Sequence, residues 1–140
     1  MHKDYFEGIL QLRDVSKEVY SFVNDLIEQR EGVNIAKIKH LKNGKDLYIS
    51  SQKYLQIIGK RLVEKFGGEY KVSTKLHTRN RVSSKEVHRV TVLFRQPKFK
   101  KGDTITHRGD ELLILNLSKK VYCKNLSTGK KVTIRYDKLN

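Results

Sequence analysis

The spacing of apolar residues at the start of the chain changes from a strand-like to a helical period. Tyr5–Arg13 reads as a strand, and apolar residues then recur every three or four positions as far as Ile27. Asp14 or Ser16 can cap this helix at its beginning, and Gly32 supplies a signal for its end. We therefore expect a strand followed by an amphipathic helix.

A hairpin signal follows the first helix. Asn43-Gly44 is the type of dipeptide that most strongly favours a tight turn between two antiparallel strands. The turn separates Asn34–Lys42 from Lys45–Ser50, which both read as strands.

A second helix and a longer pair of strands complete this part of the chain. Ser50 or Ser51 can cap the helix, and Gly67-Gly68 ends it. The strands Tyr70–Thr78 and Glu86–Arg95 follow, joined by a polar, basic turn. The order strand-helix-strand-strand-helix-strand-strand predicts an α+β domain in which two helices cover one face of a mainly antiparallel sheet.

Pro97, the only proline in the chain, indicates a domain boundary. Short apolar stretches separated by turn residues come after it: Asp103–His107, Glu111–Leu117, Val121–Leu126 and Lys131–Tyr136. Short strands at such spacing are typical of a small barrel. We predict the α+β domain over residues 1–96 and a small all-β barrel over residues 97–140. So short a barrel has little core of its own, and we expect it to lean on the first domain or on a partner.

The composition adds a strong positive charge to this picture. The 140 residues include 30 Lys and Arg against 15 Asp and Glu, a net charge of +15. Self-repulsion destabilises such a compact chain, so we expect a polyanionic partner. Nucleic acid is favoured over a membrane because the cations lie on expected strands and loops rather than along one amphipathic helix. The lone Cys and the lack of a long apolar run or signal peptide predict a cytoplasmic protein.

Residues that could carry catalysis or bind a metal are scattered along the sequence. The five His form no pair at helical spacing, and Cys123 has no local partner for a zinc site. Cys123 lies in an expected strand, where a buried, inert thiol is the usual state. Gly67-Gly68 follows a helix instead of opening one, and no glycine-rich phosphate-binding motif occurs. We therefore expect no catalytic residue, metal site, cofactor or small-molecule substrate.

The clearest candidate site is a set of cations on the two long strands. Between Lys71 and Arg108 there are eleven Lys or Arg and two acidic residues. Strand alternation sends Lys71, Lys75 and Arg79 to one face, and Arg89 joins them if the two strands pair. The alternative is a solvated strand face that resists edge aggregation. We predict that the main phosphate-contact face consists of Lys71, Lys75, Arg79, Arg81, Lys85 and Arg89.

Two further clusters of lysines are candidates for RNA contact. One surrounds the hairpin turn and the other belongs to the expected barrel. Lys outnumbers Arg, and few aromatic residues interleave with the charges, so the pattern favours contact with the backbone of structured RNA over base reading of single strands. The hairpin cluster contains Lys37, Lys39 and Lys42, and the barrel cluster contains Lys98, Lys100, Lys101, Lys119 and Lys120.

Four segments together resemble a known family. They are Asn43–Ser51, Tyr70–Leu76, Arg89–Arg95 and Lys101–Ile105. Their order and spacing resemble the large-ribosomal-subunit nuclear-export adaptor family, which is named for nonsense-mediated decay. The likeness extends from Tyr5 to the end of the sequence.

The resemblance implies a domain similar to a ribosomal protein of the L22e type, followed by an OB/SH3-like barrel similar to the hypusine-bearing translation factor. It implies a non-enzymatic ribosome biogenesis factor that binds rRNA of the large subunit, near the exit site and mobile stalk, during late assembly or quality control. The partners would be this rRNA and proteins of the same subunit, and we expect a monomer. The family's zinc-binding Cys-x-x-Cys pairs are absent from this sequence, so zinc binding does not carry over. We expect an archaeal-type member.

Two other functions remain open at this point. The chain could be an RNA-binding accessory module of an enzyme that modifies rRNA or tRNA, with the catalytic residues on a partner. It could also be a protein-interaction barrel whose charge serves solubility, and its partner binding would then survive high salt.

Overall fold

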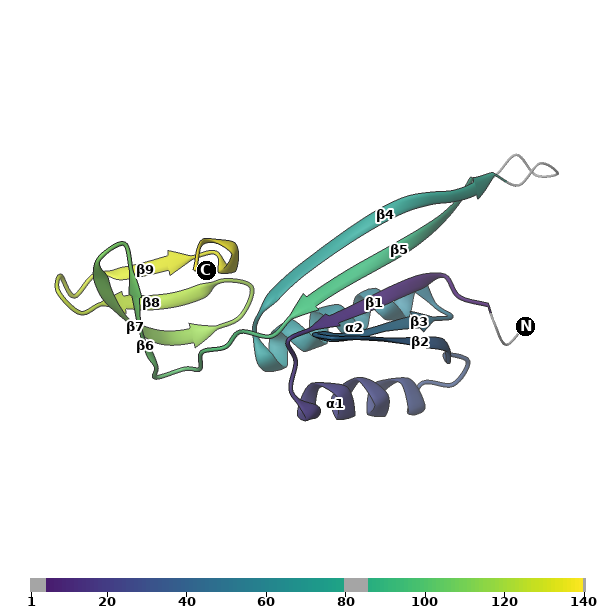
Figure 1. Cartoon of the computed structure of the whole chain (residues 1–140), viewed down its shortest axis with the longest axis horizontal. Coiled ribbons are helices and arrows are strands. Elements are labelled where there is room, and N and C mark those ends of the chain that lie inside the picture. The colour runs from purple at the N-terminus through teal and green to yellow at the C-terminus, as the bar shows by residue number, and fades with distance from the viewer. Residues whose placement is uncertain (1–4, 80–85, 140) are drawn as a thin grey trace.

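The computed structural model describes residues 5–79 and 86–139, which form two β-sheets and two helices (Figure 1). The first part of the chain follows the strand and helix order expected from the sequence, and the overall class is α+β as predicted. The elements are β1 (Gly8–Arg13), α1 (Lys17–Glu28), β2 (Ile35–Leu41), β3 (Gly44–Ile49), α2 (Gln52–Phe66), β4 (Glu69–Arg79), β5 (Glu86–Arg95), β6 (Thr104–His107), β7 (Asp110–Leu117), β8 (Val121–Asn125), β9 (Lys131–Ile134) and the 3₁₀ helix η1 (Tyr136–Lys138).

The first sheet has five strands in the order β2-β3-β1-β5-β4. Every neighbouring pair is antiparallel except one, in which the central strand β1 runs parallel to β5. The register places Leu10 between Leu47 and Val92, so these three side chains share one face of the sheet. All three are buried.

Both helices pack on that same face, because their apolar residues join one core with the even-numbered residues of β1. The Oγ of Ser51 accepts a hydrogen bond from the N–H of Tyr54 at 3.1 Å and caps α2. The Tyr54 hydroxyl donates to the carbonyl oxygen of Leu26 at 2.9 Å and links the two helices. Gly59 lets α2 approach the sheet closely, since a Cβ there would lie 2.4 Å from the ring of Tyr70. Within residues 5–79 and 86–139, no helix packs on the opposite face of the sheet.

The second sheet corrects one expectation. Its strands pair in the order β6-β7-β8-β9, all antiparallel, and in the described residues β6 and β9 do not pair to close a barrel. Barrels of the OB type have five strands, and this sheet has four short ones. It nevertheless has a small core of its own, formed by Leu112, Ile114, Val121, Cys123 and Ile134.

The second sheet leans on the first where α2 ends. Gly67 and Gly68 have φ angles of +68° and +127°, a conformation that favours glycine. The N–H of Gly68 donates to the hydroxyl of Tyr136 at 2.8 Å and lies 3.3 Å from the carbonyl oxygen of Ser118. The Tyr136 hydroxyl in turn donates to that Ser118 carbonyl at 2.7 Å. These contacts fix the end of α2 against the turn between β7 and β8.

Candidate nucleic-acid interface

The face of the first sheet opposite the helices, which we call the open face, carries cations from four of its five strands. The register puts Lys75 opposite Arg89, so the predicted pairing of the two long strands is confirmed. Toward the opposite edge of the sheet, Lys37 of β2 pairs with Tyr48 of β3, and Tyr48 pairs with Ile9 of β1. These three side chains lie on the open face. The cations of the open face are Arg13 (β1), Lys37 and Lys39 (β2), Lys71 and Lys75 (β4), and Arg89 and Arg95 (β5).

Ion pairs offset some of the cations of the open face, both in its middle and at its edge. On the edge strand β4, Lys71 Nζ lies 3.2 Å from Glu69 Oε1. Arg13 donates to Asp46 at 2.7 Å, and both side chains are largely buried, with 13% and 12% of their area exposed. Among the side chains that the structure describes, Lys37, Lys39 and Lys75 form no ion pair. The outer strands β2 and β4 are four inter-strand steps apart, or about 19 Å. A positive surface this broad suits contact with the backbone of a folded nucleic acid, whereas a single extended strand would need only a narrow groove.

Two aromatic rings on the open face are already covered by cations. The rings of Phe6 and Tyr48 meet edge to face, with centroids 4.9 Å apart. The guanidinium of Arg89 lies 3.8 Å from the centroid of Phe6, and the Lys37 ammonium lies 5.6 Å from that of Tyr48. Each ring therefore has a cation near it, and a base that stacked on the same side of the ring would have to displace that cation. Sequence reasoning missed Phe6 and Tyr48, because only the pairing of β3 with β1 and β2 brings them beside these cations.

The residues predicted for the main phosphate-contact face are brought together in part. Lys71 and Lys75 are exposed on the open face, and Arg89 is half-buried beside them. Arg79 is the last residue of β4, and its side chain is not described. Arg81 and Lys85 lie outside the described residues.

The hairpin cluster contributes to the same surface. Lys37 and Lys39 are exposed on the open face, and Lys42 is exposed in the turn between β2 and β3. The sequence predicted this cluster as a second, separate site. In the structure, the sheet brings Lys37 and Lys39 onto one face with the cations of β4 and β5.

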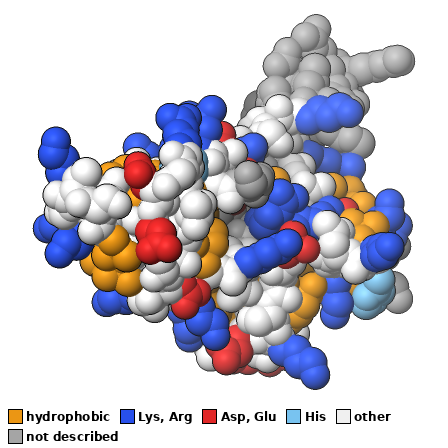
Figure 2. Space-filling view, turned by 60° about the vertical axis from the view of Figure 1, so that its left-hand side comes forward, with side chains coloured by type: hydrophobic (Ala, Val, Ile, Leu, Met, Phe, Trp, Pro, Cys, Tyr) orange, Lys and Arg blue, Asp and Glu red, His pale blue; other side chains and the backbone are white. Residues whose placement is uncertain are grey.

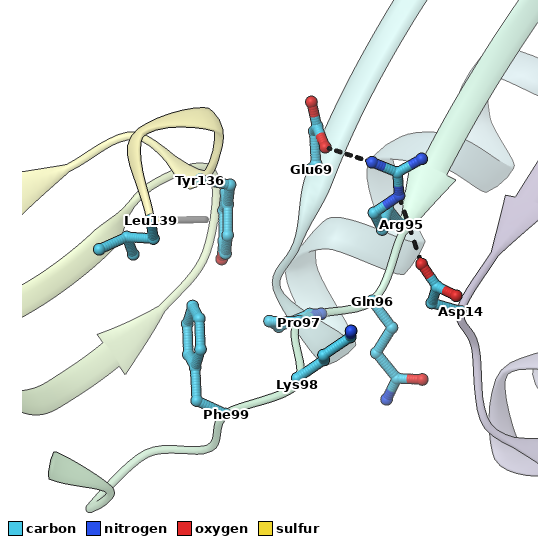
Figure 3. A pocket seen from close by; sticks show the side chains of 9 residues that line it. All are labelled: Asp14, Glu69, Arg95, Gln96, Pro97, Lys98, Phe99, Tyr136 and Leu139. Carbon is cyan, nitrogen blue, oxygen red and sulfur yellow. Dashed lines mark ion pairs between the residues drawn. The ribbon is translucent and has the colours of Figure 1, made fainter. Parts of the chain in front are cut away.

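The barrel cluster lies at the junction of the two sheets instead of on the open face. A cavity of about 420 Å³ opens there, which we call the junction cavity (Figure 3). Lys98 lines it, and two smaller hollows adjoin it, one with Lys119 and Lys120 and the other with Lys100 and Lys101. Lys71 of the open face lines the same hollow as Lys119 and Lys120, so the two cationic surfaces are continuous. Figure 2 shows that Lys and Arg side chains are spread over the face that it draws and outnumber Asp and Glu there.

Catalytic chemistry has little support in the part of the chain that the structure describes. There, no three His, Cys, Asp or Glu side chains gather as they would around a metal ion. Burial raises the pKa of the Cys123 thiol, which keeps it in its unreactive protonated form. No helix of residues 5–79 and 86–139 is long and apolar enough to cross a membrane.

Comparison with known proteins identifies the family. The family model described as "NMD3, second domain" matches residues 5–95, which include both helices and all five strands of the first sheet. No curated protein matches the chain. The matched segment contains the whole open face, including the hairpin that brings Lys37 to it. The chain belongs to the NMD3 family.

Proposed function

We propose that this chain is a non-enzymatic ribosome biogenesis factor that binds rRNA of the large ribosomal subunit through its open face. Membership of the NMD3 family indicates a ribosome-related export or biogenesis role. The observation that carries the proposal is the open face itself, where cations of four strands meet on a sheet surface that neither of the two described helices covers. We propose late assembly or quality control as the stage of action, which the resemblance to the family supports.

The chemistry of the open face favours contact with the phosphate backbone. Lysines at both edges can neutralise phosphates and release condensed counterions, which makes binding strongly dependent on salt. The aromatic rings that could have stacked on bases are occupied by Arg89 and Lys37. The face therefore recognises the shape of structured rRNA. We propose that the second sheet extends the contact toward the exit site and the mobile stalk, a location that rests on the family resemblance alone.

The test is co-sedimentation of the chain with purified large and small ribosomal subunits across a salt series. The variant Lys37→Glu/Lys71→Glu/Lys75→Glu reverses three charges on the open face. Its matched control, Lys53→Glu/Lys60→Glu/Arg61→Glu, makes the same change in net charge on exposed positions of α2. The wild type should bind the large subunit in preference to the small one, and its affinity should fall linearly with salt on a log–log plot.

The open-face variant should lose most of this affinity, and its salt slope should decrease by about 2 to 3, since each phosphate contact contributes about 0.7 to 0.9. The α2 control should keep a slope close to that of the wild type. Circular dichroism melting of both variants checks that they fold. If both variants bind the large subunit equally well, the open face is not the binding surface.

A further inference from the structure

We propose that the junction cavity binds one unpaired nucleobase of an RNA strand, while the flanking phosphates lie on the lysines of the two adjoining hollows. This proposal rests on the proposed function, because it assumes that RNA is the partner. It assigns a role to the lysines after Pro97, which the open face does not include.

The wall of the cavity on the side of the second sheet is apolar and aromatic. Phe99 and Tyr136 present their rings to the cavity in Figure 3, with Leu139 beside Tyr136. Both hydrogen bonds of the Tyr136 hydroxyl, to Gly68 and Ser118, hold this ring in one orientation. A fixed aromatic ring is a ready stacking surface for a base, because little side-chain freedom is lost on binding.

The opposite wall is polar and can read the edge of a base. Arg95 lies between two carboxylates, with Nε 3.6 Å from Asp14 Oδ2 and Nη1 3.7 Å from Glu69 Oε2 (Figure 3). These are long contacts, and 45% of the Arg95 side chain remains exposed. The guanidinium can therefore donate to the acceptors of a base, while the carboxylates can accept from an exocyclic amine. A volume of about 420 Å³ is within the range of sites for small organic groups.

The positions of the cations favour RNA over an apolar peptide as the occupant. One adjoining hollow shares Glu69 and Tyr136 with the cavity, and the other shares Gln96, Pro97 and Phe99, so the three form a continuous groove. A planar, partly apolar group with negative charges on both sides fits this groove, and a nucleotide within a single strand has that chemistry. The cations at the two ends are Lys71, Lys119, Lys120 and Arg135, and Lys65, Lys100 and Lys101.

The first test measures whether the chain distinguishes a base from bare backbone. The probes are a short fluorescein-labelled oligoadenylate and the same oligomer with abasic sites at its centre, which has equal phosphate charge. Fluorescence anisotropy with the wild type should show at least about fivefold tighter binding of the base-bearing oligomer. Phe99→Leu keeps an apolar side chain and should abolish that preference. The control Phe22→Leu, in the helix pair where Phe22 packs on Phe66, should retain it. Equal affinity of the wild type for both oligomers would overturn the proposal.

A second measurement does not depend on the stability of the Phe99 variant. Cys123 is buried, so Lys98→Cys provides a selective attachment point for a benzophenone maleimide at the edge of the cavity. On purified large subunits this probe should cross-link to rRNA. Cross-links to ribosomal proteins alone would refute the proposal and identify a protein as the occupant.

The outcomes separate this proposal from the proposed function. If charge reversal on the open face abolishes subunit binding while the base preference is absent, the junction proposal fails and the proposed function stands. If the base preference is present while the open-face variant binds subunits as well as the α2 control, the proposed function fails and the cavity still binds a base.

Discussion

The hydroxyl of Tyr136 is the group whose removal tests the junction most directly. It donates to the Ser118 carbonyl at 2.7 Å and accepts from the N–H of Gly68 at 2.8 Å, so one oxygen atom links the end of α2 to η1 and to the turn between β7 and β8. Tyr136→Phe deletes this atom and retains the ring. The variant therefore isolates the hydrogen bonds from the packing.

The expected loss of stability follows from the groups left behind. Each hydrogen bond contributes about 0.5 to 1.5 kcal/mol net, and a buried polar group that loses its partner costs about 1 to 3 kcal/mol. Gly68 N–H retains the Ser118 carbonyl at 3.3 Å as a weaker acceptor, which moves the cost to the lower end. We expect Tyr136→Phe to lower the free energy of unfolding by about 1 to 2 kcal/mol.

Urea unfolding followed by circular dichroism, together with amide hydrogen exchange, measures this loss. The control is Tyr122→Phe, which removes a hydroxyl from an exposed side chain of β8. Exchange at Gly68 and in β7–β8 should accelerate in Tyr136→Phe, while exchange in the first sheet should change little. Equal unfolding midpoints for the two variants would refute the assignment of these hydrogen bonds as the link between the sheets.

Three further predictions concern stability. Asp46→Ala leaves the largely buried guanidinium of Arg13 without its carboxylate, so the free energy of unfolding measured in urea should fall by about 3 kcal/mol. A fall of less than about 1 kcal/mol would show that the ion pair contributes no more than an exposed one. Gly67→Ala should lower the melting temperature more than Gly129→Ala does. Both glycines have a positive φ, but of the two only Gly67 would bring a Cβ against a neighbour, Leu117, at 2.7 Å. Equal falls in melting temperature would contradict this reasoning. Burial raises the pKa of Tyr136 above its ordinary value of about 10. Above about pH 10 the unfolded state releases the phenol proton while the folded state retains it, so the free energy of unfolding should fall as the pH rises past that value. Melting temperatures across alkaline pH should show a shallower fall in Tyr136→Phe, and an identical fall would exclude Tyr136 as the cause.

Local signals in the sequence were sufficient to predict the elements of the first sheet. Asn43-Gly44 marked the hairpin, Ser51 capped α2, and Gly67 ended it, because each of these signals acts within a few residues. Strand alternation also predicted that Lys75 and Arg89 would face the same way, and their pairing confirms it. Pairing between distant segments was beyond such reasoning. The parallel contact of β1 with β5 is set by the shared core, and no local pattern records it.

The second sheet shows where sequence reasoning stopped. The four strands after Pro97 were predicted close to their observed positions, but closure into a barrel depends on whether β6 and β9 meet, which strand spacing does not determine. The lysines in this region were assigned to the barrel as a unit. Their grouping around a cavity became visible only with the junction, since the cavity also needs Asp14 and Arg95 from the first sheet.

The two cationic surfaces differ in the information that each can read. A charge of +15 alone favours attachment to any RNA, because phosphate contacts carry no sequence information. Under the proposed function, the open face would add recognition of shape, through lysines spread over a broad sheet. Under the junction proposal, the cavity would add recognition of a base edge, through Arg95 and its carboxylates. Lys71, which also pairs with Glu69, borders both surfaces, so under the two proposals a strand that leaves a duplex on the open face would enter the groove beside it. Specificity for one place on the large subunit would then require a duplex and an unpaired nucleotide at a fixed separation, which the hydrogen bonds of Tyr136 would set.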